Sequence, residues 1–225
     1  MRVLVTGTGA RVGKTWVACA LARALRDSGK PIIAIKPVET GRSGPPSDWE
    51  DGVRLAKATG QQQPTQAIIR LPLPGAPVLG GEGVEKEIDY DALLLKIERY
   101  IEGVEVALIE GTGGLLTPVT WEWNMTDLAC DLAACALVVA EDRLGTINHT
   151  LLTLSALELA GIPCAGVVLT TPETTDQSTG ANAAAISRLS GLDRVMSMPR
   201  ATDPGDAAGA IKPVVSWLSR VAAPA

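Results

Sequence analysis

The chain has 225 residues, of which 46% are hydrophobic, and a formal net charge of −5 at pH 7. This length suits one α/β domain over residues 1–225 that buries a sizeable core. The mildly acidic balance and the lack of a basic cluster argue against binding to nucleic acid or to an anionic membrane surface.

The cysteines and the N-terminus indicate the compartment. The four cysteines are Cys19, Cys130, Cys135 and Cys164. They form no C-x-x-C pair and lie among Ala, Leu and Val, so we expect reduced, buried thiols. The first residues enter a strand without a charged leader and an apolar signal region. No apolar run reaches the ~18 residues of a membrane span. We therefore expect a cytoplasmic protein that does not enter the membrane.

The N-terminal segment has the pattern of a buried strand, a glycine-rich turn and a helix. Residues 7–15 read G-T-G-A-R-V-G-K-T. Backbone N–H groups in such a turn, together with the positive end of the helix, form a cradle for a polyphosphate. Lys14 would reach the β- and γ-phosphates, and the Thr15 hydroxyl would ligate Mg²⁺. The turn has one residue more than G-x-x-x-x-G-K-[ST], and the alternative is a tight connection without a ligand.

A second basic residue follows the next expected strand. Residues 32–35 are a continuous apolar run, typical of a parallel strand that is covered on both faces. Lys36 comes directly after it, and residues 37–41 are expected to form a turn. Because ligands bind at the carboxyl ends of parallel strands, Lys36 is expected at the same sheet edge as the phosphate loop. The alternative is an exposed strand end.

Acidic residues for a metal come from the next segment. A helix is expected to start at Ser47 or Asp48, with one of them as its cap. Asp48 is either that cap or a Mg²⁺ ligand, and Asp51, one turn further on, is the competing candidate. Residues 61–87 are interpreted as an ordered excursion around the active edge, with a strand-like core at residues 67–69. A helix over residues 91–100 follows.

The strand expected at residues 104–109 ends in an acidic residue and glycines. Glu110 is followed by G-T-G-G, the Walker-B arrangement in which the carboxylate faces the metal. A glycine-rich turn is the alternative. The N-terminal loop favours the metal role, since both elements predict the same sheet edge.

The second half continues the alternation of strands and helices. Residues 121–124 form a polar-aromatic loop, either a flap or a surface contact, and a helix begins near a cap at Thr126 or Asp127. The N-terminal amides of the helix after residue 144 are a candidate carboxylate site, and His149 is interpreted as structural. The remaining strands are expected at residues 136–140, 164–169 and 195–199, and the remaining helices at 182–189 and 211–221. This order predicts a doubly wound, mostly parallel sheet flanked by helices.

Several separated motifs resemble those of the dethiobiotin synthetases, in order and over nearly the whole chain. They are the long phosphate loop at residues 7–15, K-P-V-E-T-G at 36–41, S-D at 47–48, E-G-T-G-G-L at 110–115 and L-G-T-I-N-H at 144–149. The resemblance implies ATP-dependent ring closure of 7,8-diaminononanoate with CO₂ to dethiobiotin, ADP and phosphate. A carbamate and a carbamic-phosphoric mixed anhydride are the implied intermediates.

The resemblance also implies roles for single residues. Lys14 and Lys36 would stabilise the transferring phosphoryl group, and Thr15, Asp48 and Glu110 would hold Mg²⁺. It implies a homodimer with the substrate at the interface. Its implied substrate contacts are Thr40, Gly111, Leu144, Gly145, Thr146 and Asn148, and its implied nucleotide contacts are Gly9, Ala10, Arg11, Val12, Gly13, Lys14, Thr15, Trp16, Glu110, Thr170 and Pro199.

Two departures from the family pattern concern the nucleotide. Gly9 and Ala10 stand where the family usually has Asp-Thr, and Thr170 stands where many members read adenine with Asn. We therefore hypothesise a relaxed choice among nucleoside triphosphates. Two other classes of protein are possible interpretations. The first is the synthetase half of cobyrinic acid a,c-diamide synthase, but that enzyme carries a fused amidotransferase for which this sequence is too short. The second is a partitioning or septum-positioning ATPase, but those proteins carry a lysine where this chain has Gly9.

Overall fold

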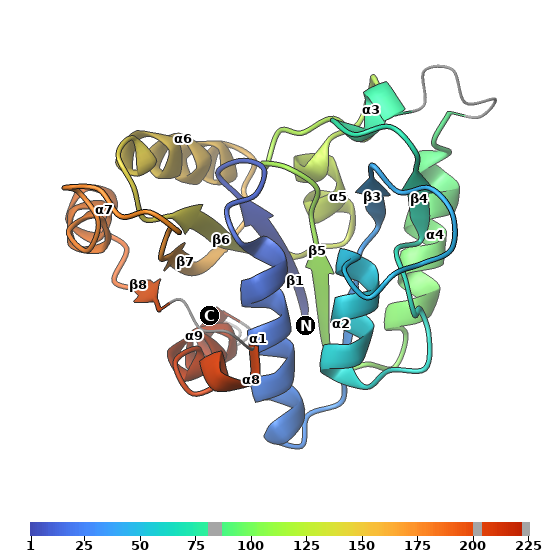
Figure 1. The fold of residues 1–225 in the computed structure, drawn as a ribbon, viewed down its shortest axis with the longest axis horizontal. Coiled ribbons are helices and arrows are strands. Elements are labelled where there is room, and N and C mark those ends of the chain that lie inside the picture. Colours follow the sequence, from blue (N-terminus) through green and yellow to red (C-terminus); the bar gives the residue numbers. More distant parts are fainter. Residues whose placement is uncertain (81–86, 200–203, 222–225) are drawn as a thin grey trace.

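The central sheet has six parallel strands in the order β2-β5-β1-β6-β7-β8 (Figure 1). The computed structural model describes residues 1–80, 87–199 and 204–221. The first strand lies inside the sheet with β5 on one side and β6 on the other, so the chain order reverses at β1. Such a switch point is where open α/β sheets bind ligands. The predicted doubly wound, mostly parallel sheet is confirmed.

The elements follow one another along the chain in a nearly regular alternation. The strands are β1 (Arg2–Gly7), β2 (Ile32–Ile35), β3 (Val38–Thr40), β4 (Ile69–Leu71), β5 (Val106–Glu110), β6 (Cys135–Glu141), β7 (Cys164–Thr170) and β8 (Val195–Met198). The helices are α1 (Lys14–Asp27), α2 (Asp51–Thr59), α3 (Pro77–Gly80), α4 (Tyr90–Ile101), α5 (Met125–Asp131), α6 (Thr146–Leu159), α7 (Asn182–Ser190), α8 (Pro204–Ala207) and α9 (Lys212–Val221).

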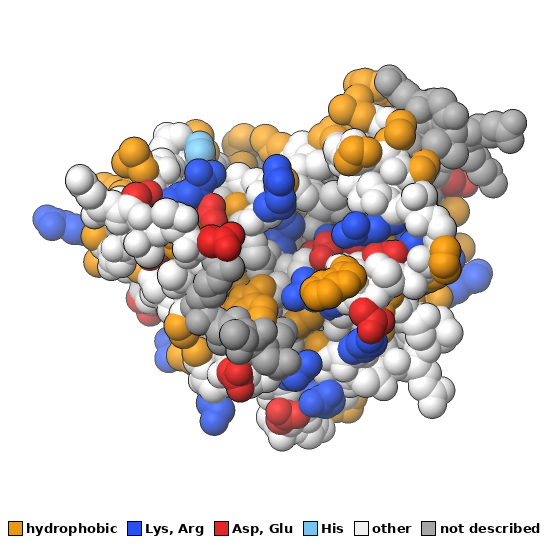
Figure 2. All heavy atoms as spheres, viewed as in Figure 1, with side chains coloured by type: hydrophobic (Ala, Val, Ile, Leu, Met, Phe, Trp, Pro, Cys, Tyr) orange, Lys and Arg blue, Asp and Glu red, His pale blue; other side chains and the backbone are white. Residues whose placement is uncertain are grey.

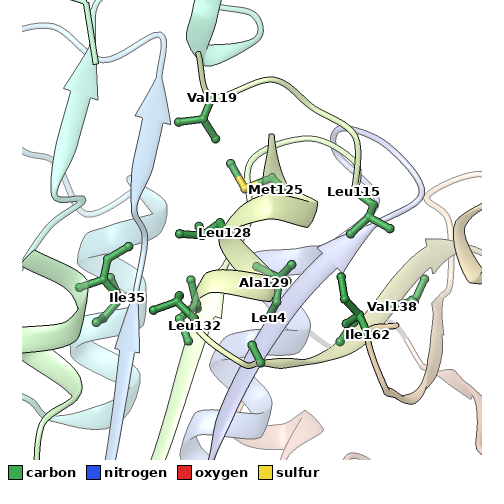
Figure 3. Packing of buried hydrophobic residues seen from close by; sticks show 14 of the residues in the cluster. Leu4, Ile35, Leu115, Val119, Met125, Leu128, Ala129, Leu132, Val138 and Ile162 are labelled. Carbon is green, nitrogen blue, oxygen red and sulfur yellow. The ribbon is translucent and has the colours of Figure 1, made fainter. Parts of the chain in front are cut away.

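Helices cover both faces of the sheet, which explains why the middle of its inner strands is apolar on both faces. Successive residues of a strand point to opposite faces, so Val3 and Val5 of β1 pack in the layer of α1, α8 and α9, whereas Leu4 packs in the layer of α4 and α5. Figure 3 shows the layer of α4 and α5, where Leu128 of α5 and Leu132, the residue after this helix, lie beside residues of the sheet. The long apolar strands therefore hold the site at the carboxyl edge of a rigid sheet.

A second, small sheet lies where the sequence predicts a turn. Residues 38–40 form β3, which pairs in parallel with β4, and the hydroxyl of Thr112 donates to the carbonyl of Val38 (2.5 Å). A three-residue strand is too short to show a periodic pattern, and its partner follows about thirty residues later. The turn expected at residues 37–41 is therefore partly strand.

The start of α5 has Asp127 near its cap as expected, whereas the start of α2 differs from the expected cap. Helix α5 is capped by Asn124, whose side-chain oxygen accepts the N–H of Thr126 (2.7 Å), while the carboxylate of Asp127 accepts the N–H of Asn124 (2.7 Å). Asp127 thus belongs to the cap but is not its first residue. Helix α2 begins at Asp51, so neither Ser47 nor Asp48 caps it.

The thiols are free, but not all of them are buried. Cys19 and Cys135 are buried, Cys164 is partly exposed, and Cys130 is exposed on α5. The expectation of four buried thiols holds for Cys19 and Cys135, holds only in part for Cys164 and is wrong for Cys130, because the sequence pattern did not show which face of this short helix points outward. In the described part of the chain, no helix combines the length and the apolarity needed to cross a bilayer.

Gly166 in β7 allows the C-terminal helix to approach the sheet. A Cβ atom at this position would lie 2.4 Å from the ring of Trp217 in α9 and 2.8 Å from the carbonyl oxygen of Arg194. We expect Gly166→Ala to lower the free energy of unfolding by about 1–3 kcal/mol, because the ring and the backbone must both shift. Urea unfolding checks this. Gly209→Ala, where a Cβ meets nothing within 4 Å, is the control, and equal midpoints for the two variants would contradict the packing argument.

Candidate functional site

The loop between β1 and α1 is closed by its own lysine. The Nζ of Lys14 donates to the carbonyl of Gly9 across the loop (2.8 Å). Gly13 has φ +91°, and a Cβ there would lie 2.8 Å from the side-chain methyl of Thr170. The loop therefore needs glycine at position 13 for both its backbone angle and its packing. Its form matches the cradle predicted for a phosphate group.

A buried group of opposite charges lies beside this loop. The Nζ of Lys36 is 2.7 Å from Oε1 of Glu110 and 3.1 Å from Oδ2 of Asp51, and it also donates to the carbonyl of Gly111 (3.2 Å). The hydroxyl of Thr15 donates to Oε1 of Glu110 (2.7 Å). Lys36 and Glu110 are 4% and 1% exposed. The predicted meeting of these two strand ends at one sheet edge is confirmed.

Burial and mutual attraction set the charge state of this group. Burial alone would lower the pKa of Lys36, but the carboxylates of Glu110 and Asp51 raise it, so this lysine stays charged. Burial alone would raise the pKa of Asp51, but the charge of Lys36 and a hydrogen bond from Thr15 lower it, so the pKa lies below its usual value. For Glu110, burial and the nearby Asp51 charge raise the pKa. The single charge of Lys36 is thus shared by two carboxylates.

Lys14 differs from Lys36 because none of the described carboxylates forms an ion pair with it. Burial, assisted by the positive charge of Lys36, lowers its pKa from 10.5 to about 8. A bound triphosphate favours the charged form, so above pH 8 the free site must take up a proton when it binds. We expect the affinity for a non-hydrolysable ATP analogue to fall by up to about tenfold per pH unit above pH 8.

Calorimetry between pH 7 and 9.5 checks this expectation. Lys14→Arg is the control, because a guanidinium stays charged over the whole range, and its affinity should lack this dependence. An affinity of the unmodified protein that stays constant over this range would contradict the prediction.

Two adjoining cavities open at the same edge. The smaller, of about 460 Å³, contains the charged group, and the larger, of about 1020 Å³, extends from the phosphate loop toward α6. Figure 2 shows basic and acidic side chains gathered at the centre of this face. Both cavities are lined by Ala10, Arg11, Thr40, Thr112 and Gly113. A polyphosphate and a second molecule could therefore bind side by side.

The residues present fit a magnesium ion held together with phosphate. Oε2 of Glu110 is buried, and no described residue hydrogen-bonds to it. Within residues 1–80, 87–199 and 204–221, no three or more His, Cys, Asp or Glu side chains gather around a common point. Mg²⁺ in nucleotide sites needs only one or two carboxylates, with phosphates and water completing its shell. Glu110, Asp51 and the hydroxyl of Thr15 are such a set.

Comparisons with known proteins identify the family. A family model described as an AAA domain matches residues 1–207. The ATP-dependent dethiobiotin synthetase BioD of Anaeromyxobacter dehalogenans is 42% identical over 205 residues, which cover 88% of this chain and 89% of that protein. The chain belongs to the dethiobiotin synthetase family. The protein of the same name from Mycobacterium tuberculosis is 36% identical and covers 92% of this chain and 88% of its own length.

Solved structures agree on the fold of this synthetase family member. The cell division ATPase MinD of Pyrococcus furiosus has a TM-score of 0.59 at 18% identity, covering 98% of this chain and 99% of its own. A ParA family ATPase of Chlorobium tepidum has a TM-score of 0.56 at 11% identity, covering 97% and 95%. At these identities the likeness shows the P-loop fold alone.

The structure separates the two aspartates considered as metal ligands. Asp48 lies outside the site, with a side chain that is 79% exposed and paired with Lys57 (2.8 Å). Asp51 lies in the charged group, 3.1 Å from Lys36. The placement of Asp48 beside the metal is thus wrong in this synthetase structure, because α2 starts at residue 51 and directs only the later aspartate inward.

Thr170 and Pro199, the two expected nucleotide contacts at the ends of β7 and β8, lie away from the charged group. The hydroxyl of Thr170 is buried beneath the loop and donates to the carbonyls of Val12 (2.9 Å) and Ala140 (3.3 Å). Pro199 is exposed after β8. Neither lines the two site cavities. Thr170 therefore supports the synthetase loop from behind, whereas Trp16 lines the smaller cavity.

The segment at the start of α6 forms a separate small cavity beside the loop. Its volume is about 250 Å³, and Leu144 and Thr146 line it opposite Gly9 and Ala10. Gly145 precedes the helix with φ +90°, and Asn148 is exposed on its first turn. No described residue hydrogen-bonds to the buried hydroxyl of Thr146. The segment expected to bind a carboxylate thus borders the phosphate loop.

Sequence reasoning missed three charged residues of the synthetase site. Glu39, Arg42 and Arg54 line the smaller cavity. Glu39 and Arg42 form an ion pair (2.8 Å). Arg54 follows Asp51 by three residues on α2, a spacing that places both on one helix face, and this spacing was the signal that could have identified it.

Proposed function

We propose that this chain closes the ureido ring of dethiobiotin from 7,8-diaminononanoate, CO₂ and ATP. Its relatives are named ATP-dependent dethiobiotin synthetases. In the proposed reaction, one amine of the substrate adds to CO₂ and loses a proton, which gives a carbamate. A carbamate oxygen attacks the γ-phosphorus, and the bond to the β-bridging oxygen breaks to release ADP. The second amine then attacks the carbamoyl carbon, and phosphate and a proton leave.

The observation that carries the proposal is the buried cation Lys36 next to a phosphate cradle, within a chain that belongs to this family. Phosphoryl transfer asks the protein for positioning and for neutralisation of charge. Lys14, across the loop mouth, would contact the β- and γ-phosphates. Lys36, held rigidly by two carboxylates, would stabilise charge on the carbamate and on the transferred group.

Magnesium would be held by the three oxygen-bearing residues of the charged group. We assign its ligation to Thr15, Asp51 and Glu110 in place of Asp48. When bound, the ion supplies charge neutralisation at the β- and γ-phosphates. Thr40, which lines both cavities, would contact the carbamate or an amine, and Gly111 would allow close approach of the substrate.

A homodimer is part of the proposal. The larger cavity is bordered by Leu116 and by Leu152 on α6, and both side chains are strongly exposed, as is Leu144 at the start of that helix. A second copy packed on this face would bury these side chains and bring its own segment 144–148 to the substrate carboxylate. Sedimentation analysis tests this, and a monomer at micromolar concentration would oppose it.

Nucleotide choice is proposed to be relaxed. Thr170 uses its hydroxyl within the protein, and Gly9 and Ala10 offer no side-chain hydrogen bond near the phosphates. The position where many family members bind adenine through Asn therefore has no hydroxyl proton left to donate to a base. Turnover with ATP, CTP or GTP as sole nucleotide tests this, and strict dependence on ATP would oppose it.

The decisive experiment for the function is direct. The protein is incubated with 7,8-diaminononanoate, bicarbonate, Mg²⁺ and ATP, and dethiobiotin is sought by mass spectrometry. Product that depends on all four components supports the proposal. Steady ATP hydrolysis stimulated by DNA or lipid, without product, would favour a partitioning-type switch instead; no other observation favours that alternative, because Gly9 stands where those ATPases carry their second lysine.

A further inference from the structure

Glu39 is a buried carboxylate whose oxygens are all used within the protein. It lies in β3 and is 3% exposed. Its Oε1 accepts the backbone N–H of Asp51 (2.8 Å) and the Nε of Arg42 (2.8 Å). Its Oε2 accepts the backbone N–H of Gly52 (3.0 Å). With both oxygens occupied, Glu39 is poorly placed to take a proton from a substrate.

These contacts replace the cap that α2 does not provide for itself. The residue before the helix is Glu50, whose side chain makes no cap hydrogen bond to the helix. That carboxylate instead faces Arg70, with N···O distances of 2.7 and 2.8 Å. The first N–H groups of a helix need acceptors from outside it, and here Glu39 supplies them to the first two residues from a neighbouring strand. A negative charge at this end also favours the helix dipole.

The first residue of the helix is also the one that faces Lys36. Asp51 donates its backbone N–H to Glu39, and its carboxylate lies 3.1 Å from the Nζ of Lys36. The other side of the helix start is closely packed, since a Cβ at Gly52 would lie 2.1 Å from the backbone nitrogen of Ala67. The helix start is therefore held between Glu39 and the backbone at residues 66–67.

We propose that Glu39 is a positioning residue that sets where the Asp51 carboxylate points and thereby how tightly the site binds a magnesium nucleotide. This proposal rests on the magnesium role of Asp51 in the proposed function. No other described side chain caps α2, so removal of Glu39 frees the helix start to move. Functional side chains must be held within about 0.5 Å of their working position, so a displacement of about 1 Å at the Asp51 carboxylate is enough to weaken its hold on a metal ion.

The test measures magnesium dependence of nucleotide binding and does not require turnover. A non-hydrolysable ATP analogue is titrated calorimetrically at increasing Mg²⁺ concentration. For Glu39→Ala, we expect the Mg²⁺ concentration at half-maximal binding to rise about three- to tenfold, with affinity in the absence of Mg²⁺ unchanged. Glu39→Gln keeps one acceptor oxygen and should give a smaller rise. Should Glu39→Ala fail to fold, Glu39→Gln carries the same test.

The control is a cap of the same kind elsewhere in the chain. Asp89 caps α4 by accepting the N–H of Ala92 (2.9 Å), and it lines neither site cavity. Asp89→Ala should lower thermal stability, as loss of a cap does, without changing the Mg²⁺ requirement. A Mg²⁺ shift of equal size in this variant would mean that lost stability alone explains the effect, and would overturn the proposal.

A double variant shows whether Glu39 acts through Asp51. In the Asp51→Ala background, Glu39→Ala should cause no further change in the Mg²⁺ requirement, because the group that it positions is absent. Equal shifts in both backgrounds, or a folded Glu39→Ala protein with an unchanged Mg²⁺ requirement, would overturn the proposal. Failure to form dethiobiotin would overturn the proposed function and leave this binding measurement intact.

Discussion

Replacement of Lys36 by methionine is expected to lower the rate of dethiobiotin formation by about 10²- to 10³-fold while nucleotide binding persists. Loss of one preorganised donor at developing charge has an effect of this size in other enzymes. Methionine keeps most of the buried volume, so the change removes charge and not packing. Nucleotide binding should persist because Lys14, which closes the phosphate loop, is untouched.

The same substitution is expected to destabilise the metal-free protein. Lys36 is the cation shared by Glu110 and Asp51, and removal of one partner from a buried ion pair costs about 3–5 kcal/mol. Added Mg²⁺ should restore part of this loss, because it would take over the neutralisation of the two carboxylates. Thermal unfolding with and without Mg²⁺ measures the effect.

Lys30→Met is the matched control for both readouts. Lys30 forms an exposed pair with Glu105 (2.8 Å), and such surface pairs contribute about 0–1 kcal/mol. Its rate and its unfolding midpoint should stay near those of the unmodified protein. A Lys36→Met protein that turns over at a near-normal rate would remove Lys36 from the mechanism.

The parts of the site that sequence predicted correctly depend on one strong rule. Lys36 and Glu110 each follow an apolar run, and parallel strands end at a common edge, so their meeting at 2.7 Å needed no knowledge of the loops. The glycine-rich turn predicted the phosphate cradle in the same way. Local pattern and sheet geometry agreed there, which is when sequence inference is most reliable.

The parts that sequence missed depend on contacts between distant residues. Helix α2 begins at Asp51 because Glu39, twelve residues earlier, accepts its backbone N–H. Arg70, twenty residues after Glu50, binds the carboxylate of Glu50 and so keeps it away from the helix start. A cap rule that considers only neighbouring residues favoured Ser47 or Asp48. The hydroxyl of Thr170 is likewise taken by the carbonyl of Val12, 158 residues earlier. Nothing in the local pattern encodes such partners.

The two aspartates give the sharpest test of this distinction. We expect Asp51→Asn to raise the Mg²⁺ requirement for turnover and to lower the maximal rate by about 10²-fold, because an amide cannot supply the negative charge that faces the metal and Lys36. Asp48→Asn, three residues earlier in the loop before α2 and with the same change of charge, should alter the rate by less than about twofold, since Asp48 is exposed and pairs with the exposed Lys57. Steady-state rates at a series of Mg²⁺ concentrations compare them directly. Loss of activity in Asp48→Asn with normal Asp51→Asn would mean that the start of α2 is placed differently when the metal nucleotide is bound.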